Sequence, residues 1–168
     1  MLANEQASDI SAVFFFLFFG LSHGQTKSKA IAEFYKSHGT DCAIFPDTYS
    51  DFPFLKNKFT PTHQQVDNAE LILKKQLRTV NIDSGYQNQN QGPVIHKKLN
   101  NYKRQYFGYI DKAGHRILLI NFFWSDHVFG KDWLFGYVMV DDGGSSFWNI
   151  KIDLDAQKLF DLVINGGG

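Results

Sequence analysis

Cysteine is almost absent from this sequence, which has Cys42 alone among 168 residues. One thiol cannot form an internal disulfide, so the fold must be stable without such cross-links. An excess of either charge is also missing, because 17 Lys and Arg residues balance 17 Asp and Glu residues. Without a basic field to attract phosphate backbones, we do not expect nucleic-acid binding as the main role.

Motifs for catalysis and metal binding are missing as well. The six histidines contain neither an HExxH nor an HxH pattern. Residues 143–146 (GGSS) lack the Lys-Ser/Thr step of a phosphate-binding loop and the Gly-x-Ser-x-Gly spacing of a nucleophile elbow. We therefore predict no catalytic residue, no metal and no cofactor.

An apolar run long enough to span a bilayer is not found either. Residues 11–21 (SAVFFFLFFGL) form an uninterrupted apolar segment, shorter than the ~20 residues of a transmembrane helix and typical of a signal-peptide core. Small and polar residues follow it, but Glu5 and Asp9 precede it where an export signal normally carries positive charge. We predict a signal peptide over residues 1–24 and a mature chain without a membrane span that is secreted or periplasmic. A buried segment of a cytosolic protein is the alternative.

Aromatic residues are abundant, at 16% of the chain with 17 phenylalanines. Such rings supply enough buried area for one domain over residues 25–168. Thr60 and Pro61 predict the start of a long helix, and Gly39 predicts the end of a short helix over residues 26–37. Residues 40–58 and 81–101 are expected to be loops. The apolar stripe of the long helix consists of Val66, Ala69, Leu73 and Leu77.

After residue 103 the hydrophobic period changes to 2, which predicts strands and turns to the end of the chain. Because the connections are short, neighbouring strands should run antiparallel. Residues 111–114 (DKAG) and 141–144 (DDGG) are expected to be hairpin turns. The five expected strands cover residues 105–110, 115–124, 133–140, 146–154 and 159–164.

These elements predict an α+β fold, in which the long helix packs on a five-stranded antiparallel meander. The helix should contribute Val66, Leu73 and Leu77 to a core whose sheet side contains Ile117, Leu119, Trp148, Ile150 and Ile152. Residues 115–124 are apolar on both faces, so the second face also needs cover from a loop, a ligand or a second subunit.

Three stretches of the sequence carry a resemblance: residues 102–109 (YKRQYFGY), 117–124 and 141–148 (DDGGSSFW). They resemble small secreted proteins of uncharacterised function from Bacteroidota-type bacteria. The resemblance implies an envelope or extracellular location and supplies no catalytic residue. The order of one long helix followed by a meander is similar to cystatin-like folds, a likeness that does not fix a function.

Tryptophan and tyrosine side chains are the leading candidates for a binding site, since each combines apolar area with a polar tip. We predict a non-catalytic module that holds a peptide, a glycan or an envelope protein on an aromatic sheet face or on its flanking loops. The alternatives are a small hydrolase that uses Cys42 or a His/Asp pair, and a structural protein that homo-dimerises through its sheet. The candidate binding residues are Trp124, Trp133, Tyr106, Tyr109 and Tyr137.

Overall fold

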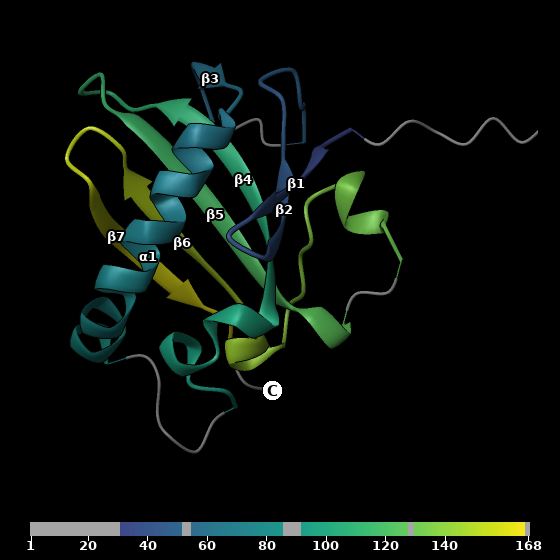
Figure 1. Ribbon diagram of the computed structural model, residues 1–168, viewed down its shortest axis with the longest axis vertical. Coiled ribbons are helices and arrows are strands. Elements are labelled where there is room, and N and C mark those ends of the chain that lie inside the picture. Colours follow the sequence, from purple (N-terminus) through teal and green to yellow (C-terminus); the bar gives the residue numbers. More distant parts are fainter. Residues whose placement is uncertain (1–30, 52–54, 86–91, 128–129, 167–168) are drawn as a thin grey trace, which may run out of the picture.

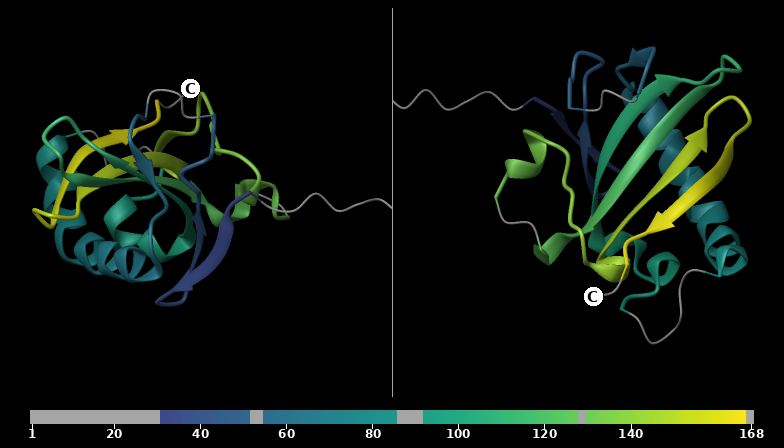
Figure 2. Two further views of the ribbon diagram at one scale, coloured as in Figure 1. Left: turned by 90° about the horizontal axis from the view of Figure 1, so that it is seen from above. Right: turned by 180° about the vertical axis from the view of Figure 1, so that it is seen from behind.

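The computed structural model describes residues 31–51, 55–85, 92–127 and 130–166 (Figure 1). The signal peptide predicted over residues 1–24 lies outside them. The described chain confirms an α+β fold, with helix α1 (His63–Ser84) lying across one face of a single sheet (Figure 2). The sheet has seven strands instead of five. They are β1 (Glu33–Ser37), β2 (Thr40–Ile44), β3 (Lys58–Phe59), β4 (Tyr102–Ile110), β5 (Arg116–Trp124), β6 (Phe147–Asp153) and β7 (Lys158–Ile164).

Helix α1 begins two residues later than Thr60 would predict, because Thr62 is the better cap. The Thr62 hydroxyl accepts a hydrogen bond from the Gln65 amide, and the Gln65 side chain accepts one from the Thr62 amide. This reciprocal capping box satisfies two amides that the helix itself leaves without partners. Gly85, with φ 65°, ends the helix. The predicted stripe of Val66, Ala69, Leu73 and Leu77 is buried against the sheet.

The helix predicted over residues 26–37 is wrong where the chain is described, because residues 33–37 form β1. His38 and Gly39 have φ values of 47° and 87°, the positive pair required by a two-residue turn of the hairpin type. That turn sends the chain back as β2, inside the segment expected to be a loop. Tyr35 and Ser37 then donate side-chain hydrogen bonds to Asp67, which ties β1 to α1.

The sheet is antiparallel except between β2 and β4, which run parallel. Four of the predicted strands, those that begin at residues 105, 115, 146 and 159, are confirmed as β4, β5, β6 and β7. The strand predicted over residues 133–140 does not form, and β5 pairs directly with β6. The predicted hairpin turn at residues 141–144 is therefore also wrong.

Two buried amides explain why residues 133–140 leave the sheet. The Gln105 amide nitrogen donates to the carbonyl oxygens of Trp133 and Gly136 at 2.8 and 2.7 Å. The Asn121 amide nitrogen donates to the Val138 carbonyl at 2.8 Å. Side chains of β4 and β5 thus satisfy backbone groups that a strand ladder would otherwise have to satisfy. The segment lies over the face of the sheet opposite α1.

Each face of the sheet consequently has its own apolar core. Trp148, Ile150 and Ile152 pack against α1, as predicted. Leu119 is buried as predicted, but on the opposite face. The reason is the register between β5 and β6, which pairs Ile120 with Ile150 and so directs the even-numbered residues of β5 toward the helix. The far core is built from Phe45, Tyr49, Phe107, Phe123, Trp133, Leu134 and their neighbours. Among the described residues, no helix is long and apolar enough to cross a membrane.

Candidate functional site

The five aromatic residues predicted to bind a partner do not share one surface. Tyr106 is fully buried and Trp133 is 3% exposed. Tyr106 and Trp124 belong to the core beneath α1, whereas Trp133, Tyr109 and Tyr137 belong to the core on the far face. Tyr106 and Trp133 could therefore contact a ligand only if the structure rearranged.

Tyr106 instead belongs to a buried polar cluster with Glu70 and Arg104. Its hydroxyl donates to Glu70 Oε1 at 2.5 Å, and Arg104 Nε lies 2.7 Å from the same oxygen. Both charged side chains are fully buried. Burial, with the Glu70 carboxylate next in importance, raises the pKa of Tyr106 well above its usual value. The Arg104 guanidinium also donates to the Tyr102 and Leu99 carbonyls, so the cluster fixes the chain that leads into β4.

The hydrolase alternative finds no activated nucleophile at Cys42. Its side chain is buried, and burial together with the Glu70 carboxylate raises the pKa of the thiol to about 12. The thiolate, which is the nucleophile, is then scarce at neutral pH. His115 Nδ1 lies 2.6 Å from Asp153 Oδ2, with the His115 side chain half-exposed, and Asp153 also accepts hydrogen bonds from the amides of Asp155 and Ala156. These hydrogen bonds stabilise the turn that follows Asp153, which is a structural role for the His115–Asp153 pair. Nowhere in the described chain do three or more His, Cys, Asp or Glu side chains converge as metal ligands would.

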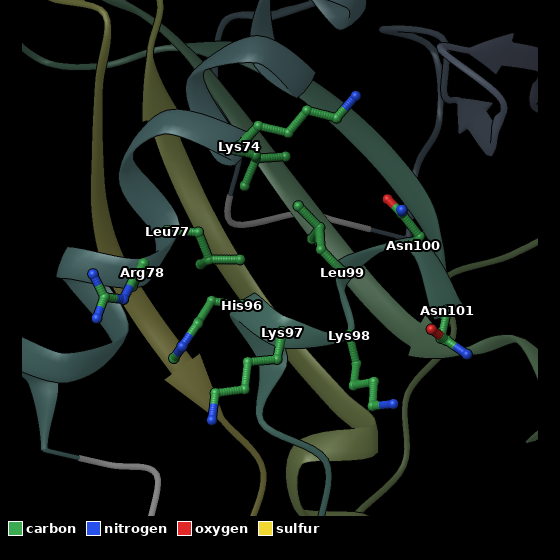
Figure 3. A pocket seen from close by; sticks show the side chains of 10 residues that line it. Lys74, Leu77, Arg78, His96, Lys97, Lys98, Leu99, Asn100 and Asn101 are labelled. Atoms are coloured by element: carbon green, nitrogen blue, oxygen red, sulfur yellow. The ribbon is translucent and has the colours of Figure 1, made fainter.

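A pocket of about 430 Å³ lies between the second half of α1 and the two short helices that follow it, η1 (Ile95–Lys97) and η2 (Leu99–Asn101). Figure 3 shows Leu77 and Leu99 between charged side chains that extend outward around them. The described residues that line it are Leu73, Lys74, Leu77, Arg78, His96, Lys97, Lys98, Leu99, Asn100 and Asn101.

Charge of one sign is concentrated at this pocket. Lys74 and Arg78 are four residues apart on α1, which places them on the same face of the helix. Lys97 and Lys98 approach from the other side. No Asp or Glu is among the described lining residues, and residues 85–110 contain neither. In the described part of the chain, none of the ion pairs involves any of these four cations.

His96 adds a titratable group to the pocket wall. Its Nδ1 lies 2.9 Å from the Asn81 side-chain amide nitrogen, which is a donor, so the imidazole accepts in its neutral form. Burial lowers the pKa of His96, and the nearby Lys97 and Arg78 lower it further. Each of these effects favours the neutral imidazole.

The sequence-based interpretation missed this pocket, since residues 81–101 were expected to be a polar loop. Two signals could have indicated it: the run His96-Lys97-Lys98, and the spacing of Lys74 and Arg78 on a predicted helix. Neither signal shows that the two groups meet, because that depends on how the chain returns past α1 after Gly85.

The fold and the pocket define an α+β protein with a cation-lined cavity beside the second half of its helix. Comparison with models of protein families, with curated proteins and with solved structures gives no match for the chain. The resemblance to small secreted bacterial proteins and the likeness to cystatin-like folds thus stay predictions from the sequence.

Proposed function

We propose that this protein is a non-catalytic binding module that holds an anionic ligand in the pocket between α1 and η1–η2. The observation that carries the proposal is the convergence of Lys74, Arg78, Lys97 and Lys98 on one cavity with no described carboxylate in its lining. In a chain of zero net charge, such a concentration of cations is not a general property of the surface. An anion is the ligand that compensates it.

The same observation narrows the partner classes expected from the sequence. A peptide, a glycan or an envelope component would be recognised through a phosphate, sulfate or carboxylate group. Part of this binding surface, residues 96–101, belongs to a segment that the sequence predicts as a loop flanking the sheet. Flanking loops are one of the two binding surfaces expected from the sequence. The other, an aromatic face of the sheet, is not part of this proposal. A secreted or periplasmic location is part of this proposal, on the basis of residues 11–21 alone.

Reversing two of the pocket charges should abolish most anion binding. For inorganic phosphate we expect a Kd on the order of 1 mM at low salt, since exposed charge pairs contribute only about 0.2–1 kcal/mol each. The double variant Arg78→Glu/Lys97→Glu should weaken binding by about tenfold or more, because two attractions become repulsions. NMR titration, with shifts followed along α1 and residues 94–101, measures both values.

A matched control is available in Lys75→Glu/Lys158→Glu. It changes the net charge equally, and both lysines are exposed and outside the pocket. Wild-type affinity is expected for this control. An equal loss of affinity in the two double variants would show that only net charge matters, and the proposal would be wrong.

Binding should strengthen as the pH falls, because of His96. Lys97 and Arg78 help to keep the pKa of the free imidazole below its ordinary value, and a bound anion offsets them. The pKa therefore rises on binding, protons are taken up, and affinity increases below neutral pH. We expect sulfate, whose charge is constant over this range, to bind about two- to fivefold more tightly at pH 5.5 than at pH 8. His96→Gln should flatten that dependence, and an unchanged slope in the variant would assign it to another group.

A further inference from the structure

A second hollow adjoins the cationic pocket. It has a volume of about 350 Å³ and shares three residues with the first: Arg78, His96 and Lys97. Its other described lining residues are Asn81, Ile82, Gly85 and Val94, none of them charged. The two hollows thus lie side by side, with Arg78, His96 and Lys97 lining both, and the remaining cations, Lys74 and Lys98, line only the first.

The uncharged end presents apolar side chains to solvent. Ile82 is 58% exposed, although it is a large aliphatic residue on a helix, and Val94 is half-buried beside it. An apolar cavity of ~150 Å³ is large enough to take benzene, so about 350 Å³ has room for one ring-sized group. An inorganic anion held by the cations of the first hollow would leave the second to water.

We infer that the natural ligand is an anionic monoester, a phosphate or sulfate joined to an uncharged ring-sized organic group that lies against Ile82 and Val94. This inference rests on the proposed function and names the ligand class for the same site. The anionic group is held by Lys74, Arg78, Lys97 and Lys98, and the organic group covers the apolar end. The ligand is bound without covalent change, so the ester bond remains intact.

Phenyl phosphate and inorganic phosphate separate the two ends of the site. At pH 8 both are dianions, and we expect phenyl phosphate to bind the full chain about tenfold more tightly, with shifts at Ile82 and Gly85 that inorganic phosphate does not cause. Ile82→Gln should remove the additional affinity for phenyl phosphate and leave the affinity for inorganic phosphate unchanged. Leu71→Gln is the matched control, because Leu71 is 54% exposed on the same helix and lines neither hollow.

The outcomes distinguish this inference from the proposed function. If both probes bind the wild-type protein equally, the second hollow contributes nothing, and the inference is overturned while the anion pocket stands. If Leu71→Gln loses the additional affinity for phenyl phosphate as fully as Ile82→Gln, that affinity does not come from contact with the second hollow. The inference is then also overturned. If neither probe binds, the proposed function fails and the inference fails with it.

Glycerol 3-phosphate tests whether the second hollow requires an apolar ring or accepts any organic group joined to the phosphate. Its organic part is polar and flexible, so it should bind no more than about twofold more tightly than inorganic phosphate. Affinity equal to that of phenyl phosphate would contradict the role given to Ile82 and Val94.

Discussion

Replacing Arg104 with methionine is expected to lower the free energy of unfolding by about 3–5 kcal/mol. The change removes the guanidinium that lies 2.7 Å from Glu70, and both side chains are fully buried. The Glu70 carboxylate would then stay buried in the core, where it accepts a hydrogen bond from the Tyr106 hydroxyl but has no counter-charge, and a buried charge without a counter-charge is costly. Urea denaturation followed by tryptophan fluorescence measures the loss.

Two further variants test the cause of that loss. Glu70→Leu/Arg104→Met removes both charges, and should be more stable than Arg104→Met alone, since an apolar pair of similar volume is often tolerated in place of a buried ion pair. Arg116→Met is the matched control, because Arg116 pairs with Asp155 at the surface and should lose less than about 1 kcal/mol. If Arg104→Met costs no more than Arg116→Met, the buried pair does not stabilise the fold as described.

Replacing Trp148 with alanine should also lower the free energy of unfolding by about 3–5 kcal/mol. Trp148 is 1% exposed, and its ring stacks on Phe122 with centroids 3.6 Å apart and planes 6° apart. Its truncation would leave a large cavity beside Phe122 and Tyr102 in the core that the sheet shares with α1. The same denaturation experiment gives the value.

Trp124 provides the comparison for this second variant. Trp124 and Trp148 both contact the Tyr102 ring edge-on, with centroids 5.1 and 5.6 Å away, but Trp124 is only half-buried at the end of β5. Trp124→Ala should therefore cost clearly less than Trp148→Ala. Equal losses would indicate that aromatic contacts as such, and not the burial of Trp148, determine the stability.

Local signals were sufficient for the elements whose ends are set within a few residues. Helix α1 follows from an apolar stripe, a threonine cap and a terminal glycine. The β4–β5 hairpin follows from the turn at Asp111, whose side chain accepts the amides of Ala113 and His115. In each case the interactions that form the element lie close together in the sequence, so the pattern of residues was enough to predict it.

Segments whose partners are distant could not be assigned in the same way. Residues 33–37 become a strand because β2 pairs with them and β4 pairs with β2. Residues 133–140 (WLFGYVMV) are rich in the aromatic and aliphatic residues of a strand, yet Gln105 and Asn121, on two other strands, bind their backbone instead. The burial of Tyr106 and Trp133, both predicted to bind a partner, likewise depends on what covers each face of the sheet.

By itself, the sequence determined the α+β class, the long helix, four of the strands and a chain with no net charge. Only the tertiary structure decided which face each residue of β5 takes, and where the cations gather. Lys74 and Arg78 lie on α1, and Lys97 and Lys98 lie about twenty residues further on. They meet because the chain returns along the helix and because Arg104, paired with Glu70, holds the Leu99 carbonyl at the pocket wall. Such a meeting depends on contacts between distant residues, which no local pattern specifies.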